Sequence, residues 1–325
     1  MPVRPFRKAS KAAIVANVKS ELLPLVAILS YRRLLSRAAA VAGAALVLLS
    51  VDSGQAAAPG TVKLNVVPHR AIYRLSLLTA RNSSPVVDAS GRMMFQWTDA
   101  CDAWAIEQHF RLNFLYAEGD EVNMTTNYAT WEAKSGESYH FMVRKTVNGQ
   151  LDEEIKGDAR PSTRAGDTVV RLTKPDAEDM HLPSGTLYPT GHTIVLLQQA
   201  LSGGQFVTRT VYDGADVDGP SEISAVIGKR MILKGGLAAG LGAKDRPSRE
   251  VLKVDAKRES RLLAGAAWPV RLAFFPTRSD SESPEYEMSM LLLHNGIAES
   301  MQIDYGDFTV NAVLETLEPL PKPRC

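Results

Sequence analysis

Histidine and carboxylate side chains are the residues of this chain whose types and spacing could do chemistry. His181 and His192 bracket the segment LPSGTLYPTG, with Asp179 close by, and Glu107 lies near His109. Such groups could bind a metal ion or form acid–base pairs. A metal site needs three or four ligands, however, and each place supplies only a pair. We therefore expect ordinary polar residues, with no catalytic residue, metal or cofactor.

The common catalytic motifs are absent from the sequence. It contains no nucleophile elbow, no HExxH zinc motif, no P-loop and no cluster of cysteines and histidines. The run GGLAAGLG, residues 235–242, is rich in glycine, but it lacks the Lys-Ser or Lys-Thr of a phosphate-binding loop. No helix pattern follows it. We interpret the stretch 234–249 as a flexible surface loop and expect a protein that is not an enzyme.

The first 58 residues have the features of a secretory signal peptide. Arginines at positions 32, 33 and 37 precede an apolar run over 38–50, and three alanines at 56–58 supply small residues for cleavage. The run is shorter than the roughly 20 residues that span a bilayer. We therefore predict one periplasmic domain over residues 59–325, not integral to the membrane after cleavage. The alternatives are an uncleaved anchor, a twin-arginine signal and a start further downstream.

The charge of the exported part argues against nucleic acid as a partner. The full chain has a formal net charge of +1, but the leader carries much of the basic excess. Residues 59–325 hold 29 Lys and Arg against 34 Asp and Glu, a net charge of −5. A protein that binds nucleic acid needs a basic face. The acidic run Asp152–Glu154 is interpreted as a solvated strand face.

Cys101 and Cys325 are the two cysteines of the chain, and both belong to the exported part. They form no CxxC motif, and an even pair in an oxidising compartment is typical of a disulfide. Two free thiols are the alternative. A bond would attach the last residue of the chain to an early hairpin. The prolines at 319, 321 and 323 predict an extended tail beside it.

Most of the exported part shows the period-two alternation of half-buried strands. In the hairpin predicted over 91–116, Phe110, Leu112 and Phe114 alternate with polar residues. Asn148-Gly149 and Asn295-Gly296 are strong hairpin turns. The other strands are predicted over 66–80, 121–131, 138–147, 150–156, 167–174, 205–212, 222–233, 251–263, 268–275, 285–293, 298–305 and 308–317. The stretch 81–90, rich in Ser, Asn and Pro, is predicted as a loop.

One helix is predicted over 191–202, where Ile194, Leu197 and Leu201 have helical spacing. Thr190 is its expected N-cap and Gly203 its stop. The strand and helix patterns therefore predict a mostly β fold with one main helix, in which a long antiparallel meander either curls into a barrel-like shell or splits into packed sheets. A curled sheet can leave a groove lined by aromatic and methionine side chains. The candidate liners are Tyr73, Phe110, Phe114, Phe141, Tyr286, Met288 and Met290.

Four stretches carry a resemblance to a known family. They are residues 69–73 (HRAIY), 91–95 (GRMMF), 147–154 (VNGQLDEE) with Lys156-Gly157, and 182–190 (LPSGTLYPT) with His192. In this order they resemble the EipB family of periplasmic proteins, named for cell envelope integrity. The resemblance implies one large curled antiparallel sheet, spiral or open-barrel-like, with one main packed helix, and one disulfide, carried onto Cys101 and Cys325. It also implies a fold similar to carriers of lipoproteins or acyl chains, and no assigned catalytic residues.

These observations predict a periplasmic, non-enzymatic protein that supports envelope integrity by binding a hydrophobic ligand, a lipoprotein or a peptide in the curled sheet. The first alternative is an envelope hydrolase that acts on peptidoglycan or lipid. In that case, changes at His181, His192 or Asp179 would abolish activity. The second is a scaffold that recruits partners by strand addition at a sheet edge.

Overall fold

The fold was analysed in a computed structural model, which describes residues 64–162, 166–235, 261–277 and 282–325. The predicted signal peptide lies outside these ranges. So do residues 236–249 of the predicted loop and most of the strand predicted over 251–263, whose described end is not in a strand.

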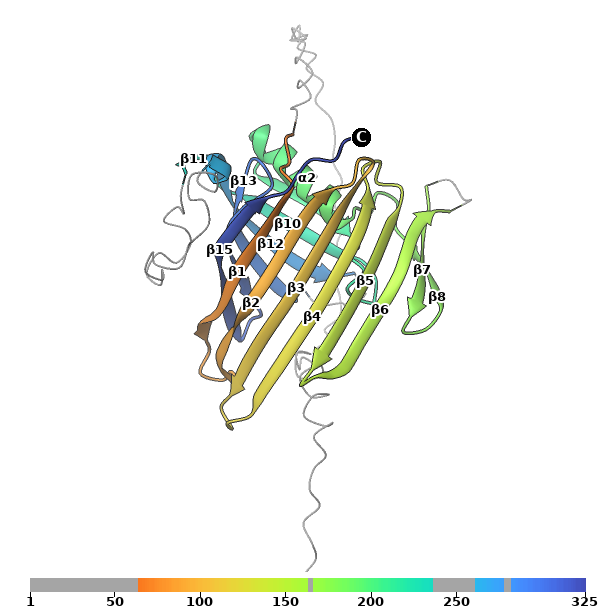
Figure 1. The fold of residues 1–325 in the computed structure, drawn as a ribbon. Helices are drawn as coiled ribbons and strands as arrows, with labels where there is room; N and C mark the ends of the chain where they lie inside the picture. Colours follow the sequence, from red (N-terminus) through yellow and green to blue (C-terminus); the bar gives the residue numbers. More distant parts are fainter. Residues whose placement is uncertain (1–63, 163–165, 236–260, 278–281) are drawn as a thin grey trace, which may run out of the picture. The chain divides into compact units, whose positions relative to one another are not determined.

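The described residues form fifteen paired strands and a long helix, α2 (Figure 1). The elements are β1 (His69–Ala80), β2 (Val86–Asp99), β3 (Ala103–Tyr116), β4 (Glu121–Ala133), β5 (Tyr139–Val147), β6 (Gln150–Pro161), β7 (Thr168–Lys174), β8 (Glu178–Leu182), α2 (Pro189–Leu201), β9 (Phe206–Val211), β10 (Ser221–Ile227), β11 (Met231–Lys234), β12 (Ala264–Pro276), β13 (Tyr286–Leu293), β14 (Ala298–Asp304) and β15 (Phe308–Pro319).

All strands belong to one antiparallel sheet. Its order is β8-β7-β6-β5-β4-β3-β2-β1-β15-β14-β13-β12-β10-β9, with β8 and β9 as the edge strands at its two ends. The short strand β11 lies off this order and pairs with β12. Figure 1 shows β10 and β12 passing behind β2 and β3. The predicted fold class, a large curled antiparallel sheet with one main packed helix, is confirmed. Twist accumulates from strand to strand, and a sheet of this width curls as a result.

The curl gives the sheet an inner and an outer face. Trp97 of β2 and Ile106 of β3 belong to the same buried cluster as Ile223 of β10, Val270 of β12 and Leu197 of α2. Strands distant in the sheet order therefore share a core. We call the face that carries these residues the inner face. Side chains alternate along each strand, so the neighbours of these residues lie on the outer face.

A covalent link joins the turn between β2 and β3 to the end of the chain. The sulfur atoms of Cys101 and Cys325 are 2.08 Å apart, and 224 positions separate the residues in the sequence. Cys101 lies in the turn between the two strands, and its φ is 67°. The last six residues form no strand.

Several predicted boundaries differ from the structure for local reasons. β2 begins at Val86, inside the predicted loop, because Val86 pairs with Tyr116 and is buried. The single strand predicted over 222–233 is two strands, β10 and β11. The last residue of β10, Ile227, pairs with Val270 of β12. The residue before Val270 is Pro269, which has no N–H and cannot donate the next hydrogen bond between the two strands. The short edge strand β8 was missed, because a five-residue strand shows little periodicity.

Candidate ligand-binding surface

Several apolar side chains of β13 face inward but are only partly buried. Met288 pairs with Leu272 and Met290 with Val270, and directly paired residues share a face of the sheet. Leu272 and Val270 are 5% and 2% exposed, whereas both methionines are of intermediate exposure and pack against the same cluster. The inner face of β13 therefore keeps contact with solvent.

A chain of aromatic rings continues this surface across the curl. Tyr286 of β13 stacks on Phe274 of β12, with ring centroids 4.1 Å apart. The ring centroids of Tyr286 and Tyr305 are 6.1 Å apart. The ring of Tyr305 is 5.1 Å from that of Phe308 of β15. Phe308 in turn meets Phe114 of β3 edge-on at 5.9 Å. Since β1 and β2 separate β15 from β3 in the sheet, the last contact joins strands that are not neighbours.

Together these side chains form what we call the ring–methionine surface. Its members are Phe110, Phe114, Met124, Phe274, Tyr286, Met288, Met290, Met301, Tyr305 and Phe308. None is fully buried, and Tyr305 is 37% exposed. Methionine adapts its shape to a ligand, and aromatic rings supply large apolar area at fixed geometry. Partly exposed apolar side chains gathered on one face of a sheet are candidates for a binding site.

Five of the seven predicted groove liners belong to this surface: Phe110, Phe114, Tyr286, Met288 and Met290. The other two are core residues. Tyr73 is 2% exposed and its hydroxyl donates to the Ala298 carbonyl at 2.7 Å. Phe141 is 3% exposed and packs in a different cluster, edge-on to Tyr212. Contact between any of the seven and a ligand stays a prediction.

Sequence reasoning missed three rings of the surface, Phe274, Tyr305 and Phe308. Tyr305 and Phe308 flank the turn between β14 and β15, where the Tyr305 N–H donates to the Phe308 carbonyl at 3.0 Å. Alternation is interrupted at a turn, so the inward direction of these rings is hidden in the sequence. For Tyr305 and Phe308, the one available sign in the sequence was their position beside the turn at Asp307, because aromatic residues beside a turn often cover a core edge.

Helix α2 packs against the inner face through a carboxylate from the sheet. The backbone N–H groups of Thr190 and Gly191 donate to the two carboxylate oxygens of Glu132 on β4, at 2.8 and 2.6 Å. The N-cap residue, Tyr188, forms no side-chain cap. The predicted N-cap, Thr190, is therefore wrong: it lies inside the helix because Pro189, with its fixed φ, occupies the first turn. Glu132 supplies the missing acceptors.

The capping carboxylate is buried. Glu132 is 3% exposed, and this burial raises the pKa of its carboxyl to about 7, although the hydrogen bonds from Thr190 and Gly191 act in the opposite direction. A neighbouring residue of the helix, His192, is also buried, and its pKa is lowered to about 4 by desolvation and by the charge of Arg209. The junction between α2 and β4 thus contains two titratable groups with opposite shifts.

Tyrosine hydroxyls tie the same region to the loop after β9. The hydroxyls of Tyr128 and Tyr139 each lie 2.6 Å from the Asp213 carbonyl oxygen. Tyr139 also stacks on Tyr188, with ring centroids 4.5 Å apart. Nearby, Leu187 forms a parallel bridge to Val211 of the edge strand β9. This end of the inner face is therefore filled and cross-linked, in contrast to the ring–methionine surface.

The residues considered for acid–base or metal chemistry are dispersed. His181 and Asp179 are exposed on the edge strand β8, whereas His192 is buried in α2. Glu107 and His109 lie on the outer face of β3, and the His109 Nδ1 atom is 2.6 Å from the Asn127 side-chain oxygen. No three His, Cys, Asp or Glu side chains of the described residues gather as metal ligands. Within the same residues, no helix has the length and apolar character to cross a membrane.

Comparisons with known proteins place this geometry in a family. The model of the family described as EipB-like matches residues 61–321. The chain is 29% identical over 284 residues to the cell envelope integrity protein EipB of Brucella abortus (strain 2308), over 86% of this chain and 93% of that protein. It also resembles the crystal structure of a β-barrel-like protein of the domain of unknown function DUF1849 from Brucella abortus. That match has a TM-score of 0.68 and 28% identity, and covers 80% of this chain and 100% of the other.

Proposed function

The chain belongs to the EipB-like family, and from this membership we propose that it supports the integrity of the cell envelope as a periplasmic, non-catalytic binding protein. Its ligand is an acyl chain of a lipid or lipoprotein, held on the ring–methionine surface. The name of the Brucella relative supports the envelope role. The predicted signal peptide over residues 1–58 supports export to the periplasm.

One observation carries the proposed ligand class: inward-facing apolar side chains that the protein itself leaves partly uncovered. A concave face normally buries such residues. It does so for Tyr73 of β1 and Leu314 of β15, which are paired in the sheet. Tyr286, Met288 and Met290 remain of intermediate exposure instead. An acyl chain that covered them would gain about 0.8 kcal/mol for each methylene removed from water.

The composition of the surface favours an alkyl chain over a charged ligand. All ten members are aromatic residues or methionines, and none carries a charge. Methionine side chains repack around a flexible chain at low energetic cost. Strand addition of a peptide finds less support at edge β9, because Leu187 already occupies part of it through hydrogen bonds with Thr210 and Tyr212, each of 2.9 Å.

A charge placed on the surface should abolish this function. Met288→Glu puts a carboxylate against the bound chain, where it would have to be desolvated. We expect binding of cis-parinaric acid, a fluorescent fatty acid, to weaken by at least about 100-fold, equivalent to about 2.7 kcal/mol. We also expect the variant to fail to restore envelope resistance in a strain that lacks the protein. Fluorescence titration and growth on a membrane-active detergent measure the two effects.

Val226→Glu is the matched control, because Val226 is an exposed apolar residue of β10, 48% exposed, on the outer face. It should bind the probe and restore resistance like the unmodified protein. Circular dichroism of both variants reports whether the sheet is intact. Equal probe binding by Met288→Glu and the unmodified protein would refute the proposed site. Equal loss in both variants would show a general effect of added charge.

A further inference from the structure

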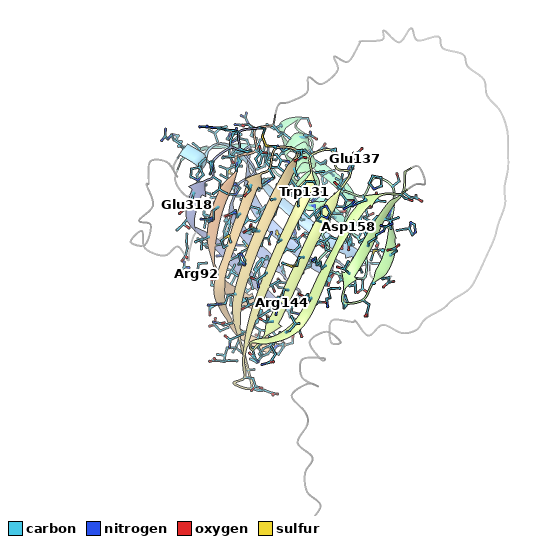
Figure 2. All side chains as sticks on the ribbon, turned by 45° about the vertical axis from the view of Figure 1, so that its right-hand side comes forward. Arg92, Trp131, Glu137, Arg144, Asp158 and Glu318 are labelled. Atoms are coloured by element: carbon cyan, nitrogen blue, oxygen red, sulfur yellow. A yellow bond between two sulfur atoms is a disulfide. The ribbon has the colours of Figure 1, made fainter. Side chains whose placement is uncertain are left out.

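The outer face of the sheet carries a hollow that the ring–methionine surface does not include. It lies over β3, β4, β5 and β6, reaches Thr173 of β7, and has a volume of about 370 Å³. This volume is at the small end of the range of roughly 300–1,000 Å³ that ligand pockets occupy. Figure 2 shows the side of the sheet that carries it, with Trp131 labelled on β4 and Asp158 on β6.

Two short side chains create the hollow. Ala105 pairs with Trp131, and Ala129 pairs with Glu107 and Met142, so each alanine sits between longer outer-face neighbours. A methyl group beside an indole leaves the ring uncovered on that side. Neither alanine is buried, which shows that no other part of the described chain fills the space above them. The floor of the hollow is therefore open sheet surface.

The wall of the hollow is an aromatic platform. Trp131 and His140 are direct partners on β4 and β5, with ring centroids 5.4 Å apart and planes inclined by 53°. Met142, 40% exposed, continues the wall on β5. Amphipathic rings of this kind offer an apolar face together with a polar edge, the Trp131 N–H and the His140 ring nitrogens.

Charged groups of both signs stand around this platform. The Glu107 carboxylate and the Lys156 ammonium line the hollow, and neither forms a hydrogen bond or ion pair with the residues that the structure describes. Asp158 also lines it and pairs with Arg160 at 3.0 Å. Carboxylate acceptors and an ammonium donor thus both line the hollow beside the aromatic wall. An anionic ligand is disfavoured because the two carboxylates would repel it. An alkyl chain is disfavoured because it would desolvate the three charged side chains.

From this geometry we propose that the hollow binds a neutral saccharide. The apolar C–H face of a pyranose ring stacks on the Trp131 indole. Sugar hydroxyls donate to the carboxylates of Glu107 and Asp158 and accept from the Lys156 ammonium, and such charge-assisted hydrogen bonds are the stronger kind. The site lies on the opposite face of the sheet from the ring–methionine surface, so it does not depend on acyl-chain binding.

Titration of the mature chain with neutral disaccharides tests this site. The probes are N,N′-diacetylchitobiose and cellobiose, measured by calorimetry and by the indole N–H resonances of the ¹⁵N-labelled protein. Saturable binding of at least one disaccharide is expected, and the Trp131 indole should shift most of the four tryptophans. Trp131→Ala should weaken binding by at least about tenfold, because the stacking contact is lost. Glu107→Gln, which keeps the shape, should weaken it less.

Phe206→Ala is the matched control, since Phe206 is an exposed aromatic residue, 69% exposed, on β9 outside the hollow. It should bind the sugar like the unmodified protein. If Trp131→Ala fails to fold, the Trp131 resonance of the unmodified protein still decides the matter. The proposal is overturned if neither disaccharide binds saturably, or if the Trp131 indole stays unshifted while binding occurs. Fatty-acid binding should be unchanged in Trp131→Ala, which separates this site from the ring–methionine surface.

Discussion

Replacing Cys101 with serine is expected to lower the melting temperature of the oxidised protein as much as replacing Cys325. The bond spans a sequence separation of 224 residues. In the chain-entropy model, a loop of this length restricts the unfolded chain by about 5 kcal/mol, an upper figure because strain in the native state reduces it. For a domain of this size, the melting temperature should fall by about 10 °C. Differential scanning calorimetry measures the change.

The double variant Cys101→Ser/Cys325→Ser is the control for this prediction. It should melt with the single variants, since all three lack the same bond. Reductant should bring the unmodified protein to the same melting temperature and leave the variants unaffected. Two results would show that the two cysteines are not bonded in the cell. One is two alkylatable thiols in protein isolated from the envelope, and the other is a melting temperature of the unmodified protein that does not change when reductant is added.

Replacing Glu132 with alanine should be the most damaging change to the packing of α2. The substitution removes the acceptors of the Thr190 and Gly191 N–H groups, of which the first is buried. A buried donor without a partner costs about 1–3 kcal/mol. Two such donors, one of them partly buried, give an expected loss of about 3 kcal/mol in the free energy of unfolding. Urea denaturation measures it, with Glu137→Ala, at the exposed turn between β4 and β5, as the control.

The free energy of unfolding should depend on pH through the protonation of the Glu132 carboxyl. Burial raises the pKa of Glu132 to about 7, so the native state holds this proton more tightly than the unfolded chain. The resulting stability is complete below about pH 4.5 and is lost as pH rises to about 7. The change is about 3 kcal/mol, at 1.36 kcal/mol for each pH unit. Glu132→Gln does not titrate and should lack this slope.

The slope must be read from the difference between the unmodified protein and Glu132→Gln, because His192 titrates in the opposite sense. Burial lowers its pKa to about 4, so the stability linked to neutral His192 is lost as pH falls below about 6.5. The two slopes oppose each other between about pH 4.5 and 6.5. A difference curve that is flat from pH 4.5 to 7 would contradict the raised pKa of Glu132.

The sequence was sufficient for the parts of the fold that local pattern determines. The alternation of Phe110, Leu112 and Phe114 predicted strand β3, and Asn148-Gly149 predicted the β5–β6 turn, where both residues have positive φ. These features depend on side-chain periodicity and on turn chemistry, which neighbouring residues fix. The family resemblance added the curl of the sheet.

The contacts that define the site could not be predicted in the same way, because they join residues far apart in the sequence. Glu132 accepts a hydrogen bond from the Thr190 N–H and so caps a helix that begins 57 residues later, at Pro189. The residue pattern around Glu132 is that of an ordinary strand and gives no sign of this contact. Phe114 meets Phe308 only because the sheet curls. Five predicted groove liners belong to the ring–methionine surface because aromatic and methionine residues at inward positions are candidates in any curled sheet. Tyr73 and Phe141 show that the same signal also selects core residues.

The central claim, that an acyl chain lies on the ring–methionine surface, is tested most directly by methionine-methyl NMR of the mature protein. Addition of myristic acid should shift the methyl resonances of Met124, Met288, Met290 and Met301, which line the inner face. The resonances of two exposed methionines outside that surface, Met142 and Met231, should stay in place. Shifts confined to the exposed pair, or no shift at any methionine at saturating fatty acid, would contradict the account.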